Sequence, residues 1–150
     1  MKQDGIFFTK EEFQPEVLEN GVVRTIKGYI EDLMVAELVW KKGQEGAVHS
    51  HPHRQCDYIL KGKFEANLNG EKRILGPGEC FYVEADVPHG LISLEDDGVI
   101  LDIFTPMRKD FVKEKKYKTG GIQFREGAEI PKKQLRQGAK RLIMNAMILF

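Results

Sequence analysis

The sequence predicts a single-domain, all-β protein, built as a sandwich or barrel. Short segments with strand-like alternation or continuous apolar character recur between residues 21 and 106. Turn signals rich in Gly, Pro, Asn and Asp separate these segments at nearly regular intervals, which is typical of antiparallel sandwiches and barrels. The length of 150 residues suits one domain. Together these observations predict about eight short strands in one fold.

Residues 1–20 form an N-terminal segment ahead of the strands. They are polar with scattered aromatic side chains. Thr9 is a typical N-cap residue and Glu12 follows three positions later, which predicts one helical turn. Pro15 prevents that turn from extending into a longer helix. The first residues contain no apolar stretch of the kind found in secretory signals, so we expect a cytoplasmic protein.

The first predicted strands lie at residues 22–27 and 33–40. The first segment alternates and is β-branched, whereas the second (LMVAELVW) is almost continuously apolar, as expected of a well-buried strand. Residues 41–46 (KKGQEG) are predicted to form a glycine-bounded loop. The next strand carries the histidines discussed below and runs through residues 58–60 until Gly62 ends it.

The strongest turn signal is Asn69-Gly70, which lies between alternating residues 64–68 and 71–75. Asn-Gly favours the tight turn of a two-residue β-hairpin, so these segments are predicted to pair. Three further strands are predicted at residues 80–83, 91–94 and 99–104, before Thr105-Pro106 ends the series. In a barrel, inward-facing positions of strands distant in sequence meet in the lumen.

All four histidines fall in two short segments. His49, His51 and His53 lie close together, and His89 follows much later in the chain. Imidazole is the commonest metal-binding side chain, so this clustering predicts one metal site assembled from two distant pieces of chain. His49, His51 and Gln55 share the same parity, and on a strand such positions share a face.

His53 has the same parity but a different setting. Pro52 precedes it and Arg54 follows it. Proline within a strand-like run indicates an edge or a bulge. We therefore expect His53 to turn away from the metal or to contact the ligands instead of the ion.

Composition excludes several functional classes. Lys plus Arg and Asp plus Glu both number 23, which leaves no basic surplus for nucleic acid or for an anionic membrane. No apolar run approaches the length of a membrane span. The two cysteines, Cys56 and Cys80, are too few for a disulfide framework, and we interpret them as reduced, packed thiols.

Residues 107–150 form a charged C-terminal extension. Its first part, residues 107–118 (MRKDFVKEKKYK), is predicted to be a short surface helix, and its end, residues 142–150 (LIMNAMILF), is strongly apolar. An apolar end of this kind has to be buried on its own barrel or on a partner subunit. The sequence GIQF at residues 121–124 is similar to GIFF near the N-terminus. The extension is thus a partial repeat of the N-terminus or a dimer-contacting segment, and chance similarity is the alternative.

Two motifs resemble those of the cupins. Gly46-x2-His49-x-His51-x3-Gln55-x6-Gly62 resembles the first cupin motif, with Gln where most cupins carry Glu. The stretch from Gly78 to Pro88-His89 resembles the second motif without its terminal Asn. The resemblance implies a double-stranded β-helix (jelly-roll barrel) over residues 21–106, one divalent metal in the lumen and a homodimer. The metal ligands it implies are His49, His51, Gln55 and His89. These donor types suit Zn, Ni, Fe or Mn without choosing among them.

Within the cupins, the phrases HSHPHRQ, GKFEANLNGEK, VPHG and LDIFTPMRKDF resemble the KdgF family of pectin-degradation proteins. That resemblance implies an isomerase of carbohydrate metabolism, which converts 4,5-unsaturated uronate monosaccharides from pectin or alginate to the linear keto form. The string Asp-x-Phe-Thr-Pro-x-Arg then marks Asp102, Phe104 and Arg108 as active-site residues. Members of the family usually end near Phe111, so the long extension is a departure from it.

The residue types suit this chemistry. Three neutral imidazoles and an amide leave the full charge on the ion, which favours a strong Lewis acid and an anionic substrate. Ring opening removes a proton from the anomeric hydroxyl and delivers one to the enol carbon, and one carboxyl, Asp102, can do both. Arg108 offers a planar fork for the uronate carboxylate. The structural alternatives are a solvated Asp102 on an edge strand, a surface Arg108 and a core Phe104.

Two other functions compete with the isomerase. The same ligand types occur in metal-dependent dioxygenase and decarboxylase cupins. A cupin that binds a sugar without turnover is a third interpretation, and a carboxyl in the lumen such as Asp102 would separate it from an enzyme. For the isomerase the expected partner is a small acidic sugar, with no nucleic acid and no membrane.

Overall fold

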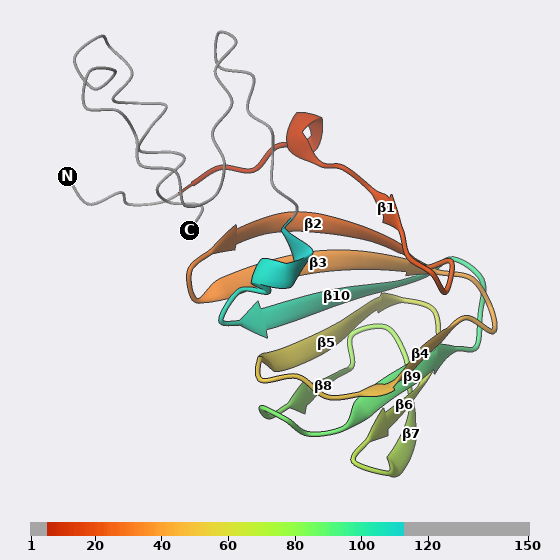
Figure 1. Ribbon diagram of the computed structural model, residues 1–150. Coiled ribbons are helices and arrows are strands. Elements are labelled where there is room, and N and C mark those ends of the chain that lie inside the picture. Colours follow the sequence, from red (N-terminus) through yellow and green to blue (C-terminus); the bar gives the residue numbers. More distant parts are fainter. Residues whose placement is uncertain (1–5, 113–150) are drawn as a thin grey trace, which may run out of the picture. The chain divides into compact units, whose positions relative to one another are not determined.

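In the computed structural model, which describes residues 6–112, two antiparallel sheets face each other (Figure 1). The larger sheet has the strand order β1-β2-β3-β10-β5-β8, and the smaller one β4-β9-β6-β7. The strands in chain order are β1 (Glu16–Val17), β2 (Val23–Ile30), β3 (Leu33–Trp40), β4 (Glu45–His49), β5 (Arg54–Lys61), β6 (Phe64–Leu68), β7 (Glu71–Leu75), β8 (Cys80–Val83), β9 (His89–Ser93) and β10 (Gly98–Thr105). The predicted all-β jelly roll is confirmed.

The N-terminal segment begins with a short 3₁₀ helix, η1 (Lys10–Glu12). The Glu12 carboxylate accepts a hydrogen bond from the Thr9 backbone N–H at 2.8 Å, which confirms the predicted helix start. Strand β1 then pairs with β2. The predicted boundary at residue 20 stays a prediction, although β1 shows that part of this segment joins the sheet.

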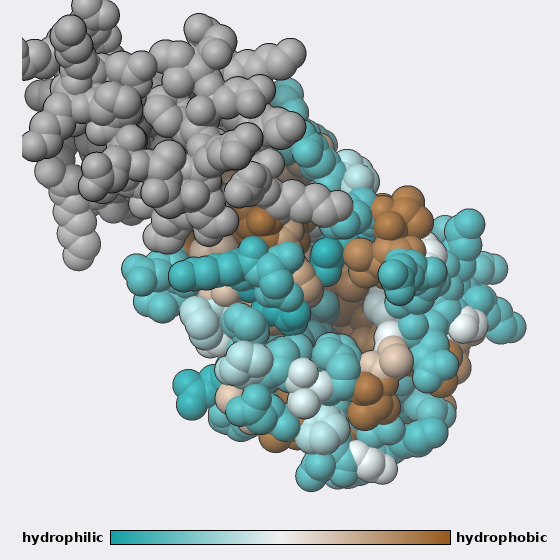
Figure 2. All heavy atoms as spheres, in the orientation of Figure 1, coloured by the Kyte–Doolittle hydropathy of each residue, from teal (hydrophilic) through white to brown (hydrophobic). Residues whose placement is uncertain are grey.

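Strand β3 alternates in burial, although its sequence is almost continuously apolar. Met34 and Ala36 are fully buried, whereas Val39 is 37% exposed. The strand is therefore covered on its inner face only. Figure 2 shows the described part of one molecular face as mainly hydrophilic, with separate hydrophobic areas between the polar residues.

The β6–β7 hairpin has the predicted two-residue loop. Leu68 pairs with Glu71. Asn69 and Gly70 between them have φ angles of 51° and 89°. Both values lie in the left-handed region that this turn requires, which Asn and Gly adopt most readily. The hairpin prediction is confirmed.

The histidine-bearing segment differs from the single strand that was predicted. Strand β4 already begins at Glu45, within the predicted loop, and ends at His49, and β5 begins at Arg54. The two strands belong to different sheets, so residues 50–53 cross between the sheets. Pro52 lies in this crossing, where the missing backbone N–H does not interrupt a strand ladder. The prediction that His49 and His51 share a face of one strand was therefore wrong, because His49 ends β4 and His51 lies in the crossing segment.

Between the sheets, large apolar side chains form the core. Phe64 is fully buried and packs edge-to-face on Trp40, with ring centroids 5.9 Å apart. Gly98 leaves room for the Phe64 ring, because a Cβ there would lie 2.6 Å from its Cζ. Both cysteines are free, with Cys56 buried and Cys80 partly buried.

The C-terminal predictions fall mostly outside the described residues. A second compact unit begins at Lys109, and the structure describes its first four residues, which contain the 3₁₀ helix η2 (Lys109–Phe111). The remainder of the predicted surface helix, the partial repeat and the apolar end at residues 142–150 stay predictions. Within residues 6–112, no helix is long and apolar enough to cross a membrane.

Candidate metal centre

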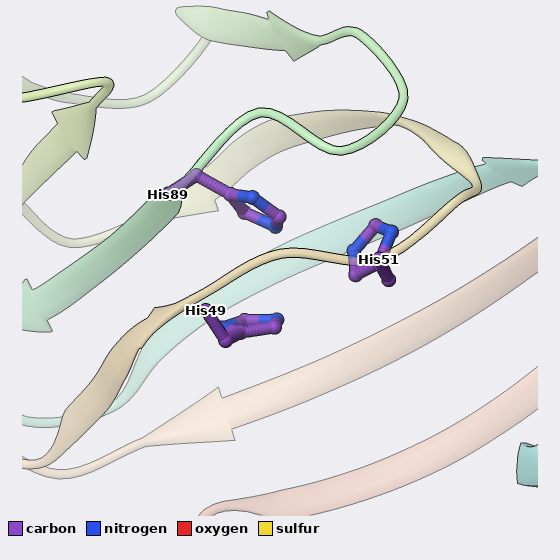
Figure 3. Close-up of side chains that lie close together, drawn as sticks. All are labelled: His49, His51 and His89. Atoms are coloured by element: carbon purple, nitrogen blue, oxygen red, sulfur yellow. The ribbon is translucent and has the colours of Figure 1, made fainter.

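Three histidines converge from three places in the fold. His49 ends β4, His51 lies in the crossing to β5, and His89 opens β9. One ring nitrogen from each lies within 4.8 Å of the others. Figure 3 shows the three rings pointing into one common space. The arrangement is one that can hold a metal ion.

Strand pairing brings His49 and His89 together. They are opposite each other in the β4–β9 ladder, and their ring centroids lie 4.6 Å apart. The two strands approach closely here, because a Cβ on Gly90 would lie only 2.7 Å from the Gly46 carbonyl oxygen. The glycine beside His89 thus permits the contact that pairs the two imidazoles.

The outer nitrogen of each ring faces a backbone carbonyl. The Nδ1 atoms of His49, His51 and His89 lie 2.8, 3.0 and 2.9 Å from the carbonyl oxygens of Ala47, His53 and Val87. Because a carbonyl only accepts hydrogen bonds, Nδ1 carries the proton in each neutral ring and Nε2 keeps its lone pair. This is the tautomer needed for a metal bound through Nε2. His53 contributes its backbone here and is outside the three-histidine group.

The Gln55 carboxamide completes the donor set. Its Oε1 lies 2.8 Å from His51 Nε2 and 3.2 Å from His89 Nε2. With both Nδ1 atoms protonated, no hydrogen lies between this oxygen and either neutral ring. Lone pairs directed at one another fit a shared cation, which suits a metal held by nitrogen and oxygen donors. All four predicted ligands are therefore side by side.

Burial keeps two of the imidazoles neutral. His51 is 8% exposed and His89 is 2% exposed. Burial lowers the pKa of His51, and the positive charge of Arg108 lowers it further. The pKa of His89 is also lowered, mainly by burial. Neutral rings do not need to lose a proton before they bind a metal.

Asp102 lies on β10, an interior strand between β3 and β5. It stands directly opposite Asp57 of β5, so the two carboxyl groups share a face of the sheet. Burial raises the pKa of Asp102 well above its usual range, and the charge of Asp57 and a hydrogen bond with Asp57 raise it further. Arg24 and Arg108 act against this rise. The solvated edge-strand alternative for Asp102 is wrong.

Asp57 was missed in the sequence analysis. It is 1% exposed, and its Oδ2 has no hydrogen-bond donor unless the neighbouring Asp102 carboxyl is protonated. A signal was present, because Asp57 shares parity with Gln55 inside an apolar strand (CDYIL). A carboxyl at an inward position of a buried strand indicates a functional or paired group.

Phe104 and Arg108 lie at the same end of β10. The Phe104 ring is 1% exposed, and its centroid lies 6.0 Å from that of His51. The guanidinium carbon of Arg108 lies 5.3 Å from the Phe104 ring centroid, and the side chain is half-buried. Phe104 is thus a core residue that also borders the histidines, and Arg108 lies beside them. Of the predicted site residues, none lies far from the others.

The comparisons with known proteins agree with this geometry. The family described as "Cupin domain" matches residues 36–104. The pectin degradation protein KdgF of Dickeya dadantii (strain 3937) is 37% identical over 107 residues, which are 71% of this chain and 97% of that protein.

Two solved structures are similar over most of their own length. The structure of KdgF from Halomonas sp. has a TM-score of 0.68 at 37% identity and covers 72% of this chain and 99% of its own. An RmlC-like cupin from Shewanella frigidimarina NCIMB 400 has a TM-score of 0.67 at 35% identity, covering 75% of this chain and all of its own.

Proposed function

Because the chain belongs to the cupins, and among them to the family of the pectin degradation protein KdgF, we propose that it is a cytoplasmic, metal-dependent sugar isomerase. It would open 4,5-unsaturated uronate monosaccharides from pectin or alginate to their linear keto form. The observation that carries the proposal is the convergence of three imidazoles and one carboxamide beside the Asp102 carboxyl.

His49, His51, Gln55 and His89 would hold the metal. The donor set fits Zn, Ni, Fe or Mn, and the ion would supply a Lewis acid close to the sugar oxygens. Since all four donors are neutral, the ion keeps its full charge and favours an acidic sugar as its ligand.

Arg108 would bind the uronate carboxylate. Its guanidinium group offers parallel N–H donors for a carboxylate, and it lies near Phe104 and His51. Its charge already lowers the pKa of both His51 and Asp102, so that charge lies within reach of the metal ligands and the carboxyl. Phe104 would form an apolar wall beneath the sugar.

Asp102 would transfer the proton. The raised pKa moves its ionisation toward neutral pH, where one carboxyl can both accept and release a proton. It would take the proton of the anomeric hydroxyl at one stage and deliver a proton to the enol carbon at the other. Asp57 beside it would keep the carboxyl from ionising at the ordinary acidic pH.

The test is direct. The purified, metal-loaded protein is given 4,5-unsaturated galacturonate, and the loss of the ring form is followed by NMR. We expect loss far faster than in buffer. A rate equal to that of buffer, from protein shown to contain metal, would contradict the proposal, and the uptake of oxygen in the same sample would favour a dioxygenase instead.

We also propose the homodimer. The outward face of the larger sheet carries exposed apolar side chains on neighbouring strands, among them Tyr58, Leu60 and Tyr82, which are 37%, 45% and 72% exposed. A partner subunit would cover such a face. Light scattering coupled to size exclusion measures the mass, and a monomer at micromolar concentration would refute this.

A further inference from the structure

A hydrogen bond between two buried side chains connects the proposed metal ligand Gln55 to Asp57. Gln55 Nε2 donates to Asp57 Oδ1 at 2.5 Å. Both side chains lie on the inner face of β5, and they are 8% and 1% exposed. The bond joins the proposed oxygen ligand to a carboxyl that the proposed reaction does not itself use as an acid or base.

We propose that Asp57 is a positioning residue that makes the fourth metal donor an amide oxygen. Gln55 Nε2 donates to Asp57 Oδ1, so the NH₂ end of Gln55 faces Asp57. The Oε1 end is then directed at the histidines, as its distances to His51 and His89 show. The inference rests on the metal part of the proposed function.

The surroundings leave Gln55 and Asp57 little freedom. Strand β5 is held between β10 and β8, so the backbone under both residues is paired on each side. The second oxygen of Asp57 is buried and has the Asp102 carboxyl as its neighbour. Asp57 therefore cannot turn away from Gln55 without leaving its oxygens without partners.

The same contact explains why a glutamate does not fit position 55. A carboxylate there would place two acidic oxygens at the present 2.5 Å separation, with no proton donor between them. The hydrogen bond that holds side chain 55 would be lost, and the two facing oxygens would push it away from its present place. Either change weakens the metal site. Glutamate, ordinarily the better ligand for a cation, would thus be the poorer one here.

The experiment is a double-mutant cycle read by metal affinity. Zn²⁺ is titrated into metal-free wild type, Gln55→Glu, Asp57→Asn and the double variant, in competition with a chromophoric chelator. Gln55→Glu should weaken binding roughly tenfold or more, as is usual when the partners that orient a ligand are lost. Asp57→Asn should cost less, because the introduced amide carbonyl still accepts the Gln55 N–H. The double variant should recover the affinity, because the amide introduced at position 57 can donate to the carboxylate introduced at position 55.

Each outcome decides the question. Affinity of Gln55→Glu equal to or above that of wild type, or no recovery in the double variant, overturns the inference and leaves the proposed function standing. Wild type that binds no Zn²⁺ overturns both. As a control, Glu65→Gln removes a half-buried carboxylate on β6 that pairs with Lys72, and combined with Gln55→Glu it should give no recovery.

A second readout applies if Gln55→Glu is too unstable to titrate. The melting temperatures of the metal-free variants are then compared. The inference requires Asp57→Asn to raise the melting temperature of Gln55→Glu, because the added change restores a hydrogen-bond donor between the two buried side chains. A double variant no more stable than Gln55→Glu overturns it.

Discussion

The two halves of the candidate site are built in different ways. The imidazole half comes from strand ends and a crossing segment, where His49, His51 and His89 are each oriented by a backbone carbonyl nearby in sequence. The carboxyl half comes from the middle of two paired strands, where Asp57 and Asp102 orient each other across the ladder. The rings of one half are thus oriented by local contacts, and the carboxyl groups of the other by long-range strand pairing.

This difference separates two tasks. His51 and His89 are kept neutral by burial, as a metal ligand requires, whereas burial and a neighbouring charge keep Asp102 protonated further toward neutral pH. Gln55 joins the halves, because its oxygen faces His51 and His89 while its nitrogen faces Asp57. If the comparison is right, metal binding and proton transfer should respond separately to mutation.

The largest effect is expected from His89→Ala. The change removes one nitrogen donor and leaves Gln55 Oε1 facing one ring fewer. We expect loss of metal in competition with a chelator and, with it, loss of activity down to the rate in buffer. Metal content by mass spectrometry checks the first, and the NMR assay the second. Activity retained without metal would contradict the assignment of metal binding to the imidazole half.

Asp102→Asn should separate the two tasks. The amide keeps the shape of the side chain but cannot exchange a proton, so activity should fall by roughly two to four orders of magnitude. Zn²⁺ affinity should stay within about threefold of wild type, because the introduced amide can still donate an N–H to Asp57 and so leaves the Asp57–Gln55 contact in place. The matched control is Asp96→Asn, which changes a carboxylate at the Lys42 backbone N–H, outside the site. A large loss of metal affinity in Asp102→Asn would mean that metal binding and proton transfer cannot be separated by mutation.

The sequence revealed the two halves unequally, for a physical reason. The metal donors are recognisable because a short H-x-H-x3-Q stretch and one Pro-His segment contain all four of them. The turn at Asn69-Gly70 was equally predictable from the sequence, since its backbone conformation favours those two residues. Asp57 was missed because its role depends on standing opposite Asp102, and strand register cannot be read from spacing. The split of β4 from β5 was missed because a crossing between sheets leaves little trace besides Pro52.

The smallest expected effect is a pH dependence of stability that arises from the carboxyl half alone. Asp102 has a folded-state pKa raised above its unfolded value of about 3.9, so in the window between the two the folded state binds more protons. Stability therefore falls as pH rises from the unfolded value through the folded one. In metal-free protein, the free energy of unfolding of wild type should decline across this window relative to Asp102→Asn, which cannot ionise there. Urea unfolding at a series of pH values measures it. Parallel curves for the two proteins would mean that burial and Asp57 do not raise the pKa of Asp102 in the folded state.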